Sequence, residues 1–400
     1  MKTLTHGCIS VVALLSLSLF CFSAPAQDAQ RDKQQSEIAR KIVTISAKVK
    51  PGEVVVISGG GHTLPLMEAL AIEASKGGAR VAPLLVTTDR VQRFSVADVS
   101  EQYLGQPSPL IEWLKSVDVR IATPDTEDPK AVLDGVPDAR LAKASRSDEV
   151  FRDALNHSKV RQVFIGVPTK TDADLVQVDW ATYQQMIWNA INADYPQIAD
   201  KGNQLKKILE NGKTVKITSP TGTNLNFSLG KREAFVNAGM VAEQPAPDTP
   251  FLSRAASLPG GDLIVAPMES SANGKIVAPK DNCRPYEHLT GATYEFKNGK
   301  MTSFKAEGNP ECFEKYFAAY GGDKDMFSSF QIGLNPALRV MEDGSDYRSG
   351  EAAGMVFIGI GNNQLWGGKN RGDFFWIIPV VKATVEVDGK TVVKDGQLVF

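Results

Sequence analysis

The amino-acid sequence predicts an α/β domain with a mostly parallel sheet, followed by an antiparallel-rich α+β domain. In the first half, short apolar runs alternate with segments of helical spacing, which is the pattern of parallel strands joined by crossover helices. In the second half, the apolar runs are shorter and are separated by Gly and Pro turns. We place the two domains at residues 35–205 and 213–400, with a passage between them at residues 201–212.

The first domain begins with a segment of helical spacing at residues 38–49, which ends at Lys50-Pro51-Gly52. A buried strand is expected next, because residues 53–58 form a short apolar run bounded by Gly. Further strands are expected at residues 79–86, 117–122 and 160–167. Helical segments separate them, and this alternation is the reason for placing the strands in one open sheet.

Three glycines and a histidine, Gly59-Gly60-Gly61-His62, follow the first strand and precede a helix from about residue 63. A Gly-rich turn between a strand and a helix can bind phosphate. This one matches neither the Walker pattern nor G-x-G-x-x-G, and no acidic residue is placed to bind a ribose. We therefore interpret it as a tight structural turn, with His62 as a polar residue at the start of the helix.

The second domain is predicted from short strands and two hairpin signals. Asn298-Gly299 and Asp388-Gly389 each stand between two short apolar runs, and such pairs favour the tight turns of β-hairpins. Other strands are expected at residues 214–219, 224–229 and 263–266. Because hairpins connect neighbouring antiparallel strands, this half is expected to be rich in antiparallel sheet.

Residues 1–26 are typical of a secretory signal peptide. A lysine at the second position is followed by an apolar stretch at residues 9–22, which is too short to span a membrane. Ala24-Pro25-Ala26 fits a cleavage site before Gln27. Cys21 suggests a lipid anchor, but the phenylalanine before it is too bulky for that processing. We therefore expect a periplasmic or secreted protein with no membrane segment after cleavage.

The remaining chain is nearly neutral and keeps two cysteines. Loss of the signal peptide, with its one lysine, changes the balance from 44 basic and 46 acidic residues to 43 and 46, a net charge of −3. This balance gives no indication of nucleic acid as a partner. Cys283 and Cys312 remain after Cys8 and Cys21 leave. In an oxidising compartment this pair favours a disulfide over a metal site with His288.

Two segments near the C-terminus, residues 354–363 and 367–377, are rich in Val, Ile, Phe and Trp and are expected to contain β-strands. Residues two apart on a strand point to the same face, so Phe375 and Ile377 share a face. Both side chains are apolar, and from composition alone these segments are ordinary core strands.

The two segments resemble the C-terminal signature of the thermophilic metallo-aminopeptidases of the aminopeptidase T/S type. In that family the first segment reads approximately Gly-Thr-Val-His-Ile-Ala-Leu-Gly, and the second ends in His-x-Asp. The resemblance extends to residues 218–229, 258–274 and 332–336, and covers nearly the whole mature chain. It implies the fold of that family and, by analogy with the dimers of the family, a homodimer.

The resemblance also implies five metal-ligand positions, of which only one keeps a carboxylate. Their residues here are Asp262, Ser329, Phe357, Phe375 and Ile377. Phenyl and sec-butyl groups offer no N, O or S donor to a metal. Carboxylates left without a cation would be buried, mutually repelling charges, so their replacement predicts a site that has closed over. We therefore expect no metal and no catalytic residues.

The hypothesis from the sequence is an exported, non-catalytic homologue that binds a peptide or another small molecule in the inherited cleft. The residues expected to line that cleft are Asp262, Glu269, Asn362, Asn370 and Asp373. Histidines do not cluster at ligand spacing, and neither a Ser-His-Asp order nor a nucleophile elbow indicates another catalytic site.

Two alternatives stay open. The first is a working aminopeptidase with a rebuilt site for zinc or another divalent metal, which needs at least three protein ligands. Its candidate donors are Asp262, Glu269, His288, Glu351 and Asp373. The second alternative is a structural or partner-binding protein whose cleft is filled.

Overall fold

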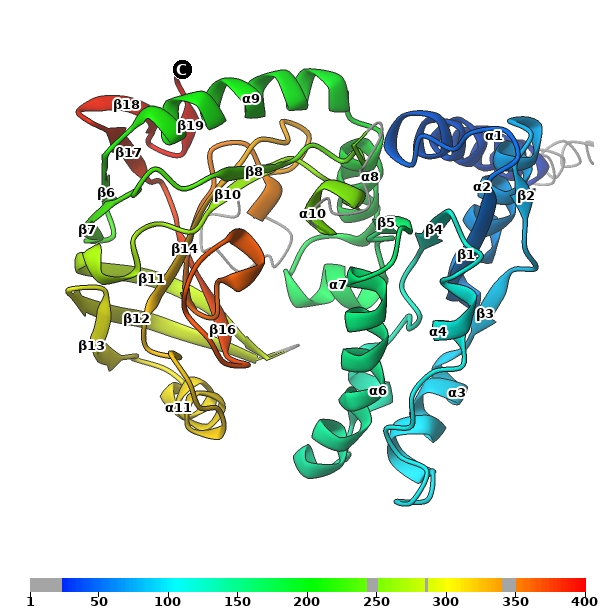
Figure 1. Cartoon of the computed structure of the whole chain (residues 1–400), viewed down its shortest axis with the longest axis horizontal. Helices are drawn as coiled ribbons and strands as arrows, with labels where there is room; N and C mark the ends of the chain where they lie inside the picture. Colours follow the sequence, from blue (N-terminus) through cyan, green and yellow to red (C-terminus); the bar gives the residue numbers. More distant parts are fainter. Residues whose placement is uncertain (1–23, 243–250, 285–286, 340–349) are drawn as a thin grey trace, which may run out of the picture.

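The computed structural model describes residues 24–242, 251–284, 287–339 and 350–400. The chain forms two halves that lie side by side, an α/β half built mostly from the earlier residues and a β-rich half built from the later ones (Figure 1). The described residues form one parallel sheet in the first half and two antiparallel sheets in the second. The predicted fold class is therefore confirmed.

The sheet of the α/β half is parallel throughout its described pairings. Its order is β2-β1-β4-β5-β9, with β3 also pairing β1. The strands are β1 (Val54–Gly60), β2 (Arg80–Val81), β3 (Leu85–Thr87), β4 (Val119–Ala122), β5 (Arg161–Ile165) and β9 (Ala255–Leu258). The last of these lies far beyond residue 205, so the chain returns to its first sheet after entering the second half.

Helices flank this sheet and connect its strands. In α2, one apolar stripe is buried against the sheet side, with Leu66, Leu70 and Ala74 at most 1% exposed. The helical elements are α1 (Ala24–Lys41), η1 (Ile42–Ser46), η2 (Gly61–Thr63), α2 (Leu64–Lys76), α3 (Asp89–Arg93), η3 (Phe94–Asp98), α4 (Leu110–Trp113), α5 (Pro129–Leu133), α6 (Asp138–Asn156), α7 (Lys170–Leu175), α8 (Trp180–Ile191) and α9 (Tyr195–Asn211).

The glycine turn after β1 is held against the segment that follows β4. A Cβ on Gly59 would lie 1.8 Å from the Thr123 hydroxyl, and one on Gly60 would lie 2.8 Å from the Asp125 carbonyl oxygen. The hydroxyls of Thr63 and Thr123 are 2.6 Å apart. The turn is therefore packed tightly against the segment after β4, and its interpretation as a structural turn stays a prediction.

The larger antiparallel sheet contains both predicted hairpins. Asn298-Gly299 joins β12 to β13 and Asp388-Gly389 joins β17 to β18, and all four turn residues have positive φ. The strand order is β13-β12-β11-β7-β6-β17-β18-β19. The strands are β6 (Thr214–Thr218), β7 (Asn224–Ser228), β11 (Asn273–Arg284), β12 (Glu287–Lys297), β13 (Lys300–Lys305), β17 (Thr384–Val387), β18 (Lys390–Lys394) and β19 (Gln397–Leu398).

The smaller antiparallel sheet has the order β16-β15-β14-β10-β8. Its strands are β8 (Ala234–Asn237), β10 (Asp262–Val265), β14 (Phe327–Gly333), β15 (Val356–Gly361) and β16 (Phe375–Val380). Short helices accompany the two sheets: α10 (Phe251–Arg254), η4 (Glu269–Ser271), α11 (Pro310–Ala319) and η6 (Gln364–Trp366). Strand β15 confirms the strand expected in the first C-terminal segment, whereas only residues 375–377 of the second segment lie in a strand, β16.

Phenylalanines join the two antiparallel sheets in one core. The ring of Phe227 on β7 lies 4.9 Å from that of Phe327 and 5.3 Å from that of Phe330, both on β14. A register shift between Phe327 and Ser329 allows both rings to lie on one side of β14. Because residues alternate between the faces of a strand, Ser329 and Gln331 then lie on the face opposite Phe330. That opposite face carries the candidate site.

The export prediction rests on residues that lie mostly outside the described part of the chain. Residues 1–23 are not described, and the described residues Ala24–Lys41 belong to α1. Among the described helices, none combines the length and the hydropathy that crossing a bilayer requires.

Candidate functional site

The five positions that correspond to metal ligands lie on one face of the smaller antiparallel sheet. Ser329 on β14 pairs with Gly359 on β15, and Gly359 pairs with Ile377 on β16. Phe375 and Phe357 share this face because each is two residues from a member of that row. Asp262 on β10 pairs with Gly333, four residues along β14 from Ser329, and so joins the same face.

The centre of this face is filled by Ser329 and Phe375, which meet over Gly359. A Cβ on Gly359 would lie 2.2 Å from the Ser329 hydroxyl and 3.0 Å from a ring carbon of Phe375. Ser329 is 1% exposed, whereas Phe375 and Ile377 are partly exposed. The Phe375 ring also contacts Trp366, with ring centroids 5.1 Å apart. Hydroxyl and aromatic groups therefore occupy the middle of this sheet face.

The carboxylate of Asp262 accepts a hydrogen bond from each of two neutral side-chain amides. The Asn237 side-chain amide on β8 donates to Oδ1 at 2.8 Å, and that of Gln331 on β14 donates to Oδ2 at 3.1 Å. The side chain is 8% exposed, and this burial raises the pKa of Asp262 to about 6, although both amides act in the opposite direction. No cation of the described chain pairs with it.

Sequence reasoning missed both amide partners of Asp262. Gln331 stands two residues after Ser329, so strand alternation would have placed it on the same face. Strand alternation could not show that Gln331 contacts Asp262, because only the pairing of β10 with β14 brings these two residues together. Gln331 also lies beside Phe357, since a Cβ on Gly350 would be within 3.6 Å of both side chains.

These residues do not fit the metal centre that the family implies. A catalytic zinc needs three protein ligands, and a dinuclear site needs more. This face offers one carboxylate with a hydrogen bond to each oxygen, one serine hydroxyl and three hydrocarbon side chains. The donor set is therefore too small and too neutral for the ion.

The donors considered for a rebuilt metal site are not gathered together. Within residues 24–242, 251–284, 287–339 and 350–400, no group of three His, Cys, Asp or Glu side chains could hold an ion. Asp262 is on β10, Glu269 begins η4, and His288 is near the start of β12 in the other sheet. Glu351 precedes β15, and Asp373 is exposed before β16.

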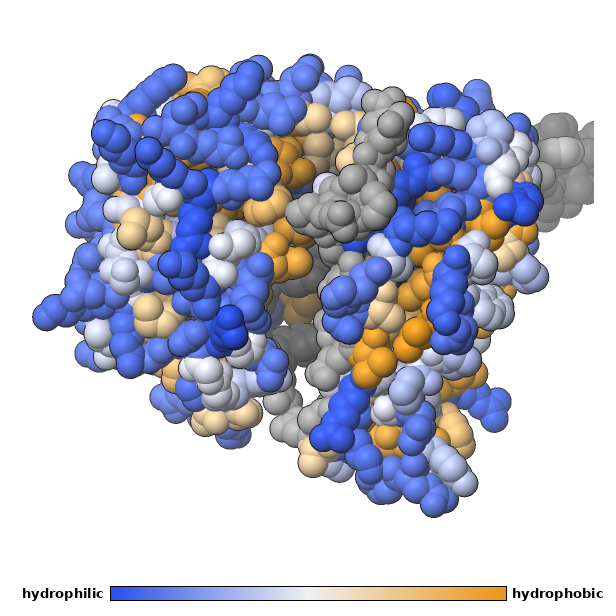
Figure 2. All heavy atoms as spheres, in the orientation of Figure 1, coloured by the Kyte–Doolittle hydropathy of each residue, from blue (hydrophilic) through white to orange (hydrophobic). Residues whose placement is uncertain are grey.

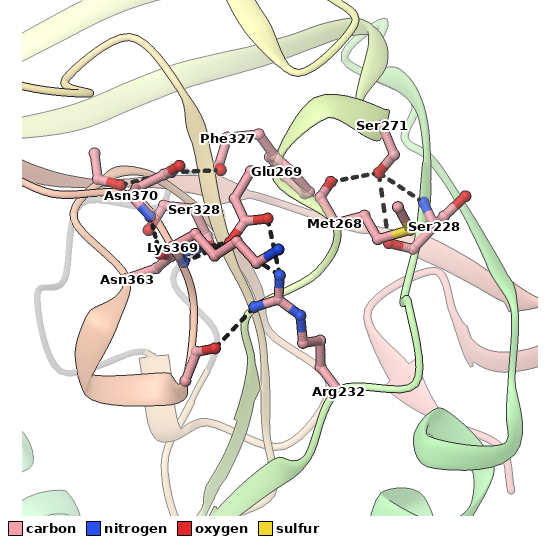
Figure 3. Close-up of polar contacts among 12 residues, drawn as sticks. Ser228, Arg232, Met268, Glu269, Ser271, Phe327, Ser328, Asn363, Lys369 and Asn370 are labelled. Atoms are coloured by element: carbon pink, nitrogen blue, oxygen red, sulfur yellow. Dashed lines mark hydrogen bonds and ion pairs between the residues drawn. The ribbon is translucent and has the colours of Figure 1, made fainter.

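Glu269 is the anchor of a separate polar network (Figure 3). Its carboxylate accepts a hydrogen bond from the Arg232 guanidinium at 2.9 Å, from the Lys369 backbone amide at 2.7 Å and from the Asn363 side-chain amide at 3.3 Å. Burial raises the pKa of Glu269, yet these hydrogen bonds and the charge of Arg232 outweigh it and hold that pKa below its usual value.

Three asparagines fasten the loop between β15 and β16 to the edge of the sheet. The Asn370 amide donates to the carbonyl oxygens of Phe327 and Gly361, each at 2.9 Å. The Asn363 amide donates to the Ser328 carbonyl at 3.1 Å. Asn362 donates to the Gly372 carbonyl at 2.5 Å. These amides satisfy buried backbone groups, so their role in the described structure is to hold the loop.

The structure thus separates the five residues predicted to line one cleft. Asp262 pairs with Gly333 at one end of β14, whereas the network around Glu269 and Asn363 reaches Ser328 near the other end. Five residues of strand span about 16 Å, at roughly 3.3 Å per residue. Asp373 is exposed beyond Asn370. Of these five residues, only Asp262 shares a sheet face with Ser329, Phe357, Phe375 and Ile377.

Comparison with known proteins agrees with this architecture. The sequence model of a family described as thermophilic metalloprotease (M29) matches residues 31–324. That match ends before Ser329, Phe357, Phe375 and Ile377, so four of the five ligand positions lie beyond it. No curated protein matches the sequence.

Two solved structures resemble nearly the whole chain. Wild-type AmpT from Thermus thermophilus has a TM-score of 0.73 at 15% identity, and the match covers 92% of this chain and 99% of that one. The 2,5-dihydroxypyridine dioxygenase from Pseudomonas putida KT2440 has a TM-score of 0.58 at 16% identity, covering 92% and 97%. At these identities the likeness shows the fold alone.

The resemblance noted in the sequence is therefore confirmed for the family. The matched residues 31–324 are more than half of the 400, and the parallel and antiparallel sheets are those of the AmpT fold. The chain belongs to the thermophilic metalloprotease (M29) family.

Proposed function

We propose that this protein is a non-catalytic member of its family that binds a peptide or another small molecule instead of cleaving a substrate. The observation that carries the proposal is the composition of one sheet face. Of five positions that correspond to metal ligands, one is a carboxylate, and amides from Asn237 and Gln331 already bind both of its oxygens. Such a face has no means of activating water through a metal.

The contacts around this face support the view that the whole metal site has been replaced, and not only one of its ligands. The Phe375 ring and the Ser329 hydroxyl fill the space over Gly359, and Asp262 has gained neutral donors in place of a cation. The fold does not require peptidase chemistry, since a protein named as a dioxygenase shares it. The partial exposure of Phe375 and Ile377 supports a ligand contact at this face.

The first prediction concerns metal content. The purified protein is expected to hold less than one zinc, cobalt or manganese ion per chain and to release no N-terminal residue from peptides, because the donors are missing. Elemental analysis and an aminopeptidase assay with added metals, before and after chelation, measure this. Purification without metal-affinity resin is the necessary control.

The outcomes separate the three functional readings. One tightly held ion per chain with chelator-sensitive peptidase activity would establish the rebuilt metallo-aminopeptidase and refute our proposal. Without metal, thermal melts in the presence of a panel of short peptides distinguish the other two. A ligand-dependent rise in melting temperature supports binding, whereas its absence across the panel supports a structural or partner-binding role.

Export, a disulfide and a homodimer belong to the same proposal. The side chain of Cys283 lies outside the described residues, so the pairing with Cys312 stays a prediction. Its support is that α11, which carries Cys312, packs against β11, which carries Cys283. The homodimer rests on family analogy, and a soluble periplasmic or secreted location rests on residues 1–26.

The second prediction is that the mature protein contains no free thiol. A bridge closing a loop of about 30 residues stabilises the fold by about 3–4 kcal/mol in the chain-entropy model. Thiol titration of the denatured, unreduced protein tests it, with reduced protein as the control. Two reactive thiols per chain would disprove the bridge.

A further inference from the structure

The parallel sheet has a second face that is separate from the site described above. On β1 and β4, Val55, Ile57, Val119 and Ile121 belong to the main hydrophobic core. The alternate residues point the other way. On that side a smaller, separate cluster is formed by Val56, Leu114, Val117, Leu155 and Val160.

A pocket of about 460 Å³ opens on this second face. Its walls are mainly apolar and include Leu84, Val86, Leu110, Trp113 and Phe151. Val86 and Trp113 are 46% and 47% exposed, so the mouth is apolar as well. Figure 2 shows hydrophobic side chains at the surface of this half, in the region that Figure 1 places between α6 and α4. Pockets of roughly 300–1,000 Å³ commonly hold small organic molecules.

Two charged residues line the pocket, Arg120 on the central strand β4 and Asp125 after it. Arg120 is partly buried, with its guanidinium 5.6 Å from the centre of the Phe151 ring. Within the described chain no hydrogen bond or salt bridge reaches it. Burial lowers the pKa of Arg120, while the nearby Asp125 acts to raise it. A guanidinium with five donors in such surroundings favours an anionic partner.

Two buried polar atoms beside Arg120 also lack a partner among the described residues. The Ser58 side chain is 8% exposed and lines the pocket, and its hydroxyl has no hydrogen bond. Gln162 on β5 pairs in register with Arg120, and its side-chain oxygen is likewise unpaired. Buried polar groups are hydrogen-bonded in the great majority of cases, so unpaired groups gathered on one sheet face indicate a missing ligand or water.

The pocket lies beside the two strands between which the strand order of the parallel sheet reverses. Strand order reverses between β1 and β4, and the pocket lies along the sheet face beside these two strands, from Val117 and Arg120 to Ser58 and Asp125. At the glycine turn, Gly59 packs closely against the side chains of Thr63 and Thr123. The open space is therefore on the face that carries Arg120.

We propose that this pocket binds a small organic monocarboxylate, with its carboxylate on Arg120 and Ser58 and its hydrocarbon part against Leu84, Val86 and Trp113. A guanidinium and a hydroxyl suit a carboxylate, which accepts from both. One guanidinium with Asp125 nearby suits a single negative charge better than the double charge of a phosphate monoester. This site is independent of the proposed function, since it shares no residue with the smaller antiparallel sheet.

Isothermal titration calorimetry with octanoate, 1-octanol and octylamine tests the proposal. The three probes share an aliphatic chain of similar length and differ in the charge of the head group. Octanoate is expected to bind at least about ten-fold more tightly than 1-octanol, because a hydrogen bond to a charged group has that effect, and octylamine is expected to bind most weakly. Equal binding of octanoate and 1-octanol, or octanoate binding only at tens of millimolar, would overturn the assignment.

Two arginine variants locate the binding. Arg120→Met removes a partly buried charge that has no hydrogen-bond partner in the described chain, so the variant is expected to fold. It should bind octanoate and 1-octanol with about equal affinity. Arg90→Met makes the same change of charge at an exposed residue outside the pocket lining and should leave the preference intact. Ser58→Ala, a smaller change, is expected to weaken octanoate binding several-fold, and it keeps the test available if Arg120→Met does not fold.

Two results of the variant series would contradict the site. The first is an octanoate preference that persists in folded Arg120→Met. The second is self-association of the chain through the apolar mouth of the pocket. It would be seen as a dimer that persists in octanoate and becomes a monomer in Trp113→Lys. That result would assign the surface to a second copy of the chain.

Discussion

The variant that restores all four lost ligands is expected to be several kcal/mol less stable than the wild type without metal and to recover stability in zinc. Its substitutions are Ser329→Glu, Phe357→His, Phe375→His and Ile377→Asp. With Asp262 it has five donors on one sheet face. An ion that binds only the folded state stabilises it by about 2.7 kcal/mol at one hundred times its dissociation constant.

The single variants are expected to lose stability without a zinc response, because none supplies three ligands. Phe357 is 5% exposed, so Phe357→His loses packing and buries a polar ring, at a cost of about 2–4 kcal/mol. Ser329 is 1% exposed, and a glutamate there places a charge beside the Phe375 ring. Ile377 is partly exposed, so Ile377→Asp should have the smallest effect.

Thermal and urea unfolding with zinc and with chelator measure both series. The matched control is the same quadruple set with Ile377→Asn in place of Ile377→Asp, which keeps the size of the side chain and removes an anionic donor. Its zinc response should be clearly weaker. If the quadruple variant folds but ignores zinc, the ligand frame has not been preserved. If a single variant responds to zinc, the wild-type face already supplies more donors than we assign to it.

The second expected result is a fall in the free energy of unfolding as pH rises from about 4 to about 6. The Asp262 carboxyl has a pKa near 3.8 when unfolded and about 6 in the fold. Because the folded-state pKa is the higher one, the contribution of this group is greatest below pH 4 and is lost as pH passes 6. A shift of about two units corresponds to a change of up to about 3 kcal/mol.

Asp262→Asn removes the titrating group while keeping its shape, so this part of the pH dependence should disappear. Urea unfolding of both proteins between pH 4 and pH 8 measures the difference, which cancels contributions from other carboxyls. Glu269 is one of these, and it has the opposite sign. Its folded pKa lies below 4.5, so its stabilisation is present above that value and is lost in more acidic solution. Equal slopes for wild type and Asp262→Asn would show that Asp262 is solvated.

The sequence determined the elements whose cause is local. Alternation of apolar runs and helical segments predicted the parallel sheet, and Asn298-Gly299 and Asp388-Gly389 predicted hairpins, because positive φ at both turn residues is a property of those residue types. The absence of a phosphate pattern around Gly60 predicted a structural turn. Strand periodicity alone placed Phe375 and Ile377 on one face. The family could also be identified from the sequence, because each of its motifs is a contiguous stretch of residues.

Contacts between distant strands were decided only by the tertiary structure. Periodicity predicts which residues of one strand share a face, but it does not predict which strands are neighbours or in what register. The return of β9 to the first sheet, the amides of Asn237 and Gln331 on Asp262, and the pairing of Glu269 with Arg232 all depend on such neighbours. The alignment of Ser58 and Arg120 on one pocket has the same origin, because it arises from the pairing of β1 with β4.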